Sequence, residues 1–161
     1  MDEIELGPVE ASDFKALSFL VGELLEEIMQ KTAHKSFHFN HEETEERASS
    51  LVSEGKYWIY VARDVATKQL VGFISLYESY ALYAEGAYGT IPELYVSEGW
   101  RSQSVGQQLL QQASEFGRAK GWRRLEVTTP QLPEFERTLK FYQANGYEVS
   151  GGRKLKIDIP A

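Results

Sequence analysis

Three consecutive segments between residues 57 and 96 have the composition of β-strands, and they restrict the possible folds more than any other feature. Residues 57–62 read Tyr-Trp-Ile-Tyr-Val-Ala, and residues 70–77 read Leu-Val-Gly-Phe-Ile-Ser-Leu-Tyr after a polar turn. Residues 89–96 supply the third segment after a bend at Ala84–Ala87. Aromatic and β-branched side chains pack well on a pleated sheet. The sequence therefore predicts three strands that follow one another as a meander.

Segments with helical periodicity lie on both sides of these strands. Apolar residues in 14–28 recur at steps of three and four behind Ser12 and Asp13, which can cap the first turn, and this predicts an amphipathic helix. Residues 42–54 indicate a second, more polar helix. After the strands, residues 105–120 repeat the pattern and end at a glycine suited to a left-handed helix end. A further helix is expected to start at Pro133 and to close at Asn145-Gly146.

Shorter alternating segments complete the pattern at residues 4–6, 125–127 and 155–159. In the last of these, Leu155, Ile157 and Ile159 alternate with polar residues. The resulting order is β, α, α, β, β, β, α, β, α, β. It predicts an α/β (α+β) fold, a single domain over residues 1–161 with a mixed, mostly antiparallel sheet flanked by helices.

The amino-acid composition limits the classes of function that this chain can have. With 42% hydrophobic and 25% charged residues, the chain has the make-up of an ordinary soluble domain. Its net charge of -7 argues against nucleic acid and anionic membranes as partners. The absence of cysteine excludes disulfides, thiolate metal sites and a cysteine nucleophile. The acidic first residues lead into no long apolar run, so neither a signal peptide nor a membrane span is expected, and the expected location is cytoplasmic.

Residues 91–110 carry the clearest chemical signal, since they read as a strand, a turn and the start of a helix. Such a turn directs unpaired backbone N–H groups and the positive end of the helix dipole at one spot, which suits a pyrophosphate. Gly106 would let a ligand approach the first helical turn, and Arg101 could add a charge-assisted contact. The turn lacks the further glycines of a dinucleotide fingerprint and the Gly-Lys-Ser/Thr ending of a P-loop.

Residues 101–106, Arg-Ser-Gln-Ser-Val-Gly, resemble the acetyl-CoA loop of the GNAT superfamily of N-acetyltransferases, written R/Q-x-x-G-x-G/A between a strand and a helix. Further segments resemble the same family: Glu93–Val96, Gln108–Leu110 and Phe141–Tyr147. The resemblance covers residues 91–147 in the right order. Three departures from the pattern occur. Ser104 replaces the first glycine, and Glu98 stands where the family often has proline. After the strand 125–128, Thr129-Pro130 replaces the asparagine that many relatives carry, so that cofactor contact is not transferred.

The resemblance implies an N-acyltransferase that moves an acetyl group from acetyl-CoA to a primary amine. The absence of cysteine favours direct attack in a ternary complex. Acetyl-CoA would be the co-substrate, with no metal, and the acceptor would be a small-molecule or peptide amine. The oligomeric state is open, a homodimer included. The residues expected to bind the cofactor are Leu94, Tyr95, Val96, Arg101, Ser102, Gln103, Ser104, Val105, Gly106 and Gln107.

Glu93 and Tyr142 are the candidate catalytic residues. Glu93 lies where the strand would meet the acetyl group and could act as a base directly or through water; otherwise it is a solvated strand residue. Pro92 marks either the start of the strand or a bulge, and a bulge could free the N–H of Leu94 or Tyr95 for the thioester oxygen. Tyr142 reads as a core tyrosine by its helical spacing, whereas the resemblance implies a general acid facing the CoA sulfur.

Three other sequence features allow either a functional or a purely structural interpretation. His34 and His38 could face one side of a helix as a metal pair, or be solvated or line the acceptor site. The tyrosines between residues 77 and 88 could form an aromatic wall for an acceptor or cover the sheet, and the acidic run 42–46 could guide a cation or face water. The alternative to an enzyme is a non-catalytic acyl-CoA-binding regulatory or interaction domain.

Overall fold

Three consecutive antiparallel strands form the centre of the fold, as the composition of these segments predicts. The computed structural model describes residues 3–33, 38–130 and 132–161. Its elements are β1 (Ile4–Pro8), α1 (Phe14–Thr32), α2 (His41–Ser53), β2 (Trp58–Asp64), β3 (Leu70–Ser79), β4 (Tyr88–Ile91), β5 (Leu94–Val96), α3 (Val105–Lys120), β6 (Leu125–Val127) and α4 (Glu136–Ala144), with short 3-10 turns at Ala11–Asp13 and Glu98–Trp100.

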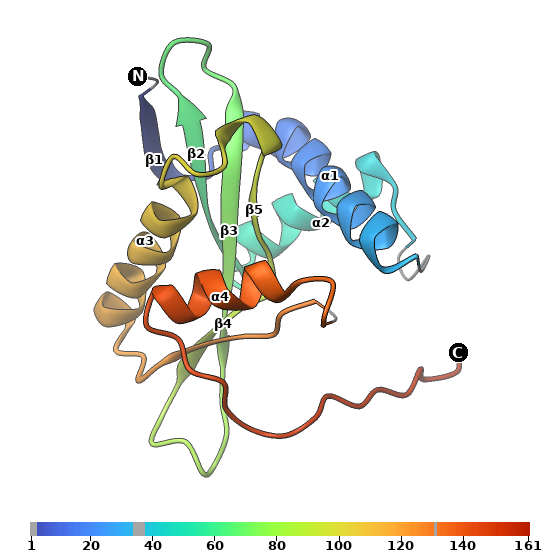
Figure 1. The fold of residues 1–161 in the computed structure, drawn as a ribbon, viewed down its shortest axis with the longest axis vertical. Coiled ribbons are helices and arrows are strands. Elements are labelled where there is room, and N and C mark those ends of the chain that lie inside the picture. The colour runs from blue at the N-terminus through green and yellow to red at the C-terminus, as the bar shows by residue number, and fades with distance from the viewer. Residues whose placement is uncertain (1–2, 34–37, 131) are drawn as a thin grey trace.

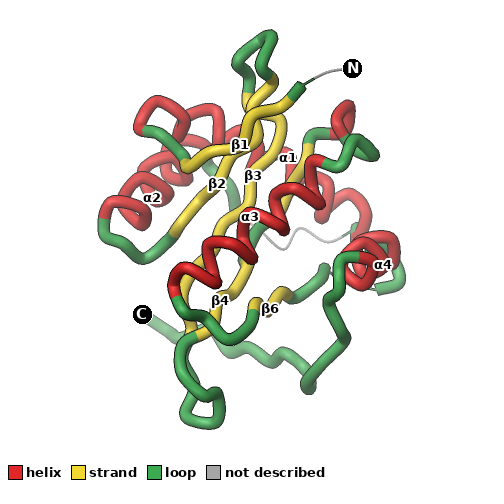
Figure 2. The backbone as a smooth tube through the Cα atoms, turned by 90° about the vertical axis from the view of Figure 1, so that its left-hand side faces the viewer, coloured by secondary structure: helices red, strands yellow, loops and turns green. Residues whose placement is uncertain are grey.

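The strands form one sheet in the order β1-β2-β3-β4-β6, and β5 pairs with β3 beyond the end of β4. Every pairing is antiparallel except that of β4 with β6, which is parallel. In Figure 1, α3 lies on one side of the sheet, and α1 and α2 lie on the other. Figure 2 views the molecule from the α3 side. The expected fold class, a mixed and mostly antiparallel sheet flanked by helices, is therefore confirmed.

Alternation along β3 builds a core on each face of the sheet. Phe73 packs toward α1 with Leu17 and Leu20. Ile74 and Leu76 point the other way, into a cluster with Leu109 and other residues of α3. The sheet is therefore buried on both faces along β3, which holds the neighbouring strands in a fixed register.

The predicted strand 89–96 is two strands, because the chain inserts one extra residue opposite β3. Ile74 pairs with Leu94, and Tyr77 pairs with Thr90. The two paired positions are three residues apart on β3 but four residues apart on the segment that contains β4 and β5. One extra residue in one of two paired strands is a β-bulge. Before the bulge, β4 pairs with both β3 and β6. After the bulge, β5 pairs with β3. The sheet therefore opens between β5 and β6.

The predicted C-terminal strand is wrong: residues 155–159 lie in an extended segment without strand pairing in the structure. Leu155, Ile157 and Ile159 are 89%, 87% and 89% exposed. Alternation predicts a strand that can bury one face, but the strand forms only if a sheet edge receives it. The last helix begins at Glu136, later than Pro133, with Phe135 at its N-cap.

A partly buried ion pair joins the start of α1 to the sheet. The Arg63 Nη2 group donates to the Asp13 Oδ1 and Oδ2 atoms at 3.0 and 2.9 Å, and the Glu10 N–H donates to the same carboxylate at 2.9 Å. The Asp13 side chain is 6% exposed and that of Arg63 23%. Asp13 therefore does not cap α1 through its side chain, as its position had suggested, but anchors the turn before it.

We expect Asp13→Ala to lower the free energy of unfolding by about 3 kcal/mol, because Arg63 and the Glu10 N–H would lose a buried partner. Urea denaturation measures the change. Lys56→Ala is the matched control, since Lys56 pairs with Glu54 at 3.5 Å while both side chains are more than half exposed. That substitution should cost no more than about 0.5 kcal/mol. Equal changes in the two variants would contradict a structural role for the Asp13 pair.

Candidate functional site

The candidate site begins at the bulge, where Ser75 holds the backbone of Glu93. The Ser75 N–H donates to the Glu93 carbonyl at 3.0 Å, and the Glu93 N–H donates to the Ser75 Oγ atom at 3.1 Å. Backbone groups alternate in direction along an antiparallel pair. Those of Glu93 face β3, so those of Leu94 face away from it, on the side where the sheet is open. Of the two N–H groups considered for the thioester oxygen, that of Leu94 has the suitable direction.

The Glu93 carboxylate lies in a largely buried setting beside two hydroxyl groups. The Ser75 hydroxyl donates to its Oε1 atom, and Tyr57 is a second hydrogen-bond partner. Burial raises the pKa of Glu93, and the bonds from Ser75 and Tyr57 partly offset this rise. A carboxylate with a raised pKa binds a proton more readily than an exposed one, which suits a general base.

Tyr57 and Ser75 are site residues that the sequence did not reveal. The Tyr57 ring stacks on Tyr77 with centroids 6.0 Å apart, and burial raises the Tyr57 pKa. Ser75 is 1% exposed. Both sit inside ordinary strand patterns, and they meet Glu93 only through the pairing of strands far apart along the chain. Of the tyrosines proposed as an aromatic wall, Tyr77 alone takes part in this cluster.

The turn before α3 has an unusual backbone. Ser102 and Ser104 adopt φ angles of 66° and 67°, in the left-handed region that favours glycine. The Ser104 carbonyl accepts from the Gln108 N–H at 3.0 Å, which starts the helix, and the Ser104 side chain makes no capping bond. The N–H groups of the first helical turn have no intrahelical acceptor. The turn therefore presents a row of backbone donors, as an anion-binding site requires.

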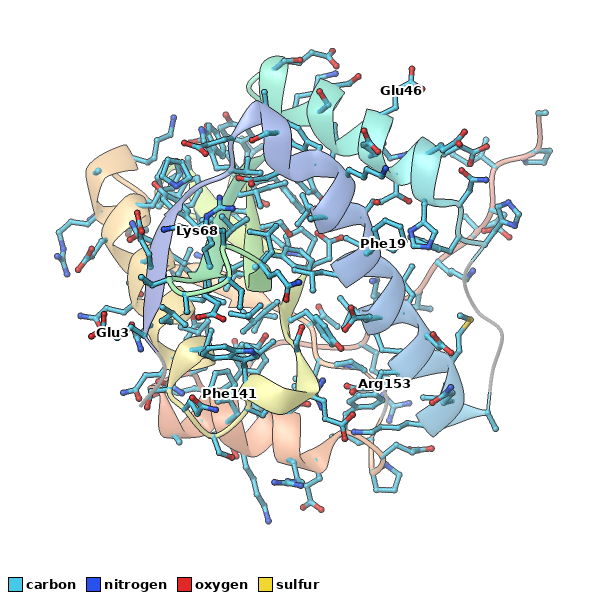
Figure 3. The ribbon with its side chains drawn as sticks, turned by 90° about the horizontal axis from the view of Figure 1, so that it is seen from above. Glu3, Phe19, Glu46, Lys68, Phe141 and Arg153 are labelled. Atoms are coloured by element: carbon cyan, nitrogen blue, oxygen red, sulfur yellow. The ribbon has the colours of Figure 1, made fainter. Side chains whose placement is uncertain are left out.

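Gly106 is needed for packing in this structure. A Cβ atom at this position would lie 3.0 Å from the Cζ atom of Phe141, a residue of α4 labelled in Figure 3. That distance is tighter than ordinary van der Waals contact. Gly106, which the sequence predicts to leave room for a ligand, thus also leaves room for the Phe141 ring to pack between α4 and α3.

Arg101 links three parts of the site. Its Nε atom donates to the Val96 carbonyl at 2.9 Å, and its Nη2 atom donates to Glu27 of α1 at 2.8 Å. The guanidinium also lies 5.4 Å from the centroid of the Tyr95 ring. The expected contact between Arg101 and a ligand phosphate would have to compete with these interactions. In this structure Arg101 fixes the turn against β5 and α1.

Tyr142 lies in the core that borders the opening. It is 6% exposed and belongs to the apolar cluster that contains Ile91, with Leu94 packed against the same cluster. Its ring meets those of Phe141 and Tyr147 edge to face, each at 5.4 Å between centroids. Burial raises the pKa of Tyr142, so its hydroxyl keeps its proton at neutral pH. A protonated hydroxyl is the state that a general acid needs.

Other expected ligand contacts point elsewhere. The Tyr95 side chain is buried beneath α1, where its hydroxyl donates to Glu23 at 3.2 Å and burial raises its pKa to about 12. The Gln103 side chain donates to the Gly99 carbonyl at 3.3 Å. His34 falls outside the described residues, and His38 is exposed. Within residues 3–33, 38–130 and 132–161, no group of three potential metal ligands occurs.

None of the helices that the structure describes has the length and apolar character needed to cross a membrane.

Solved structures with the same fold cover nearly the whole chain. An acetyltransferase from Trypanosoma brucei is 22% identical, with 98% of this chain and 100% of that chain covered at a TM-score of 0.73. A glucosamine-6-phosphate N-acetyltransferase from Arabidopsis thaliana is 16% identical, with 96% and 98% covered at a TM-score of 0.74. The aminoglycoside N-acetyltransferase AAC(6')-Iy, solved with CoA, is 15% identical, with 98% and 96% covered at a TM-score of 0.79.

Comparison with curated protein sequences finds no match. The family model described as the acetyltransferase (GNAT) family matches residues 22–147, which is most of the chain and includes the bulge, the turn before α3 and Tyr142. The chain therefore belongs to the acetyltransferase (GNAT) family.

Proposed function

We propose that this protein transfers an acetyl group from acetyl-CoA to a primary amine, which attacks the thioester directly in a ternary complex. The observation that carries the proposal is the bulge at Pro92–Glu93. There a partly buried carboxylate and an outward-facing backbone N–H lie beside an opening in the sheet. Acyl transfer to an amine needs a proton acceptor and a donor to the developing oxyanion, and these two groups match those needs.

The donor site would lie along β5 and the turn before α3. Acetyl-CoA supplies an activated acetyl thioester and carries a pyrophosphate. The N–H groups of Val105, Gly106 and Gln107 would bind the pyrophosphate at the helix N-terminus. Backbone groups of Leu94 and Val96 would hold the pantetheine arm as a neighbouring strand would be held. The Val96 carbonyl already accepts a bond from Arg101, so Arg101 would have to share or release it.

The chemical roles would fall to Leu94, Glu93 and Tyr142. The Leu94 N–H would stabilise the oxyanion that forms at the thioester carbonyl. Glu93 would accept the proton of the attacking amine, directly or through water, and Tyr142 would give a proton to the departing thiolate. Burial gives the Glu93 carboxylate an increased affinity for the proton that it would accept, and it keeps the Tyr142 hydroxyl protonated.

The acceptor is proposed to be a small-molecule or peptide amine, with cationic amines favoured. Glu23, Glu26 and Glu27 lie on α1, and α2 begins with further acidic residues. The net charge of -7 also attracts cations from a distance. Two structural neighbours are named for acetylating glucosamine-6-phosphate and aminoglycosides, which are amine-bearing sugars.

A panel of amines, each incubated with the protein and acetyl-CoA, tests the proposal through release of free thiol. Release that depends on an amine supports transfer, and mass spectrometry of the acceptor should show one added acetyl group. The alternative, a non-catalytic domain that binds acyl-CoA, predicts binding of acetyl-CoA without thiol release for any amine. Acetylation restricted to hydroxyl or carboxylate acceptors would overturn the amine assignment.

For the donor site, we expect Ser104→Asp to weaken acetyl-CoA binding about 10-fold or more relative to Ser104→Asn, because only the aspartate adds a negative charge beside the pyrophosphate. The two side chains have nearly the same shape, and both residue types tolerate the left-handed conformation that Ser104 adopts. Isothermal titration calorimetry of the folded variants gives both dissociation constants. Equal affinities would place the pyrophosphate elsewhere.

Tyr142→Phe should lower kcat by about 10² to 10⁴ at saturating acetyl-CoA, because it removes the proposed acid while keeping the ring. The dissociation constant for acetyl-CoA and the melting temperature should change little. If Tyr142 is only a core residue, the variant would instead lose thermal stability and keep its turnover.

Glu93→Gln should remove the low-pH limb of the pH profile of kcat/KM, since an amide cannot accept the proton of the amine.

A sharper test changes the hydroxyl that bonds to Glu93. Threonine and valine at position 75 have nearly the same branched shape, but only threonine keeps the hydroxyl that donates to the Glu93 carboxylate and accepts from the Glu93 N–H. Losing that donor raises the pKa of Glu93 further, so the limb should move to higher pH in Ser75→Val and stay in place in Ser75→Thr. A limb that does not move in either variant would argue against Glu93 as the base.

A further inference from the structure

Arg101 occupies a backbone group that the proposed donor site needs. The Glu93 carbonyl and the Ser97 N–H both bond to β3. Because backbone groups alternate in direction along a strand, the Val96 carbonyl faces the open side of the sheet. The Arg101 Nε atom donates to that carbonyl at 2.9 Å. The Arg101 side chain therefore lies along the edge of β5 that we assign to the pantetheine arm.

A carboxylate of α1 holds Arg101 in this position. The Arg101 Nη2 atom donates to the Glu27 Oε1 atom at 2.8 Å, which is the length of a charge-assisted hydrogen bond. The guanidinium also lies 5.4 Å from the centroid of the Tyr95 ring, and the Tyr95 hydroxyl donates to Glu23, one helical turn before Glu27. Two carboxylates on one side of α1 thus bind β5 and the turn before α3.

The Arg101–Glu27 pair is more accessible to water than the Asp13–Arg63 pair that anchors the start of α1. The Arg101 and Glu27 side chains are 37% and 27% exposed, against 23% and 6% for Arg63 and Asp13. Water weakens an ion pair at this depth, so separating the two groups costs little. A pyrophosphate carries more negative charge than a carboxylate and can accept several N–H groups of one guanidinium. An anionic ligand at the turn before α3 can therefore take Arg101 from Glu27.

We propose that the Arg101–Glu27 pair is an autoinhibitory contact in the donor site, and that acetyl-CoA binds by moving Arg101 from the Glu27 carboxylate to the pyrophosphate. The same movement frees the Val96 carbonyl for the pantetheine arm. Glu27 then sets the affinity for the donor without touching the donor. This inference rests on the proposed function, because it takes the donor to lie along β5 and the turn before α3.

The proposal predicts that weakening this ion pair tightens donor binding. When only a fraction of the molecules has a free Val96 carbonyl, the apparent dissociation constant is the intrinsic one divided by that fraction. Glu27→Gln keeps the length of the side chain and removes its charge, so the fraction rises. Loss of an ordinary binding residue would change the affinity in the opposite direction.

Isothermal titration calorimetry of the full chain with acetyl-CoA is the first test. Glu27→Gln should lower the dissociation constant about 3- to 10-fold, as expected for release of a weak ion pair. Glu26→Gln is the matched control, because Glu26 lies on the same helix, is exposed and accepts a bond from Gln30 at 3.2 Å. It removes the same charge and should change the constant less than about 2-fold. An unchanged or weaker affinity in Glu27→Gln would overturn the proposal.

Pantetheine, which carries no phosphate, separates release of Arg101 from simple charge repulsion. If Glu27 only repelled phosphates, Glu27→Gln would leave the affinity for pantetheine unchanged. Release of the Val96 carbonyl predicts that pantetheine also binds about 3- to 10-fold more tightly. In the Arg101→Gln background, where that carbonyl is already free, Glu27→Gln should add nothing. Tightening for acetyl-CoA alone, or an equal effect without Arg101, would show that the contact is not autoinhibitory.

The same titrations distinguish failure of this inference from failure of the proposed function. If the unchanged protein and Glu27→Gln bind acetyl-CoA equally well, the donor site stands and the role of Glu27 is wrong. If neither protein binds acetyl-CoA, the proposed function and this inference both fail. Because binding is measured and not turnover, the result does not depend on the acceptor.

Discussion

One extra residue opposite β3 determines how the rest of this structure can be used. Without it, β4 and β5 would be a single strand, and β6 could follow that strand along its whole length. With it, β5 stays with β3 while β6 stays with β4, and the sheet opens between them. Pro92 helps to fix the interruption, because a proline has no N–H for a regular ladder. The bulge thus creates the opening and directs Leu94 toward it.

The same interruption accounts for the setting of Glu93. A carboxylate buried in a sheet is costly unless hydrogen-bond donors compensate for the lost water. Ser75 and Tyr57 provide those donors from β3 and from the residue before β2. They also limit how far burial raises the pKa, since each stabilises the charged form. The protein therefore holds a partly buried carboxylate in one orientation, with a pKa that burial raises and the two hydroxyl groups lower in part.

Local sequence patterns predicted the meander, both long flanking helices and the turn before α3, because each depends on residues close together in the chain. They could not predict contacts made across the sheet. Ser75 reads as one polar residue in an apolar strand until the pairing brings it to Glu93, and Asp13 reads as a helix cap until Arg63 reaches it. The segment 155–159 shows the opposite case. Its alternation is real, but whether it forms a strand depends on an edge that the local sequence does not contain.

The contact between Gly106 and Phe141 has a consequence for how the site responds to its ligands. The backbone of the first turn of α3 packs directly on the Phe141 ring of α4, so a shift of one helix displaces the other. The anion-binding turn is continuous with α3, and Tyr142 follows Phe141 in α4. A displacement of the turn, transmitted through this rigid contact, would therefore move the tyrosine in the same step. The two ends of the proposed donor site would then move together, so that binding of a ligand at one end changes the position of the other.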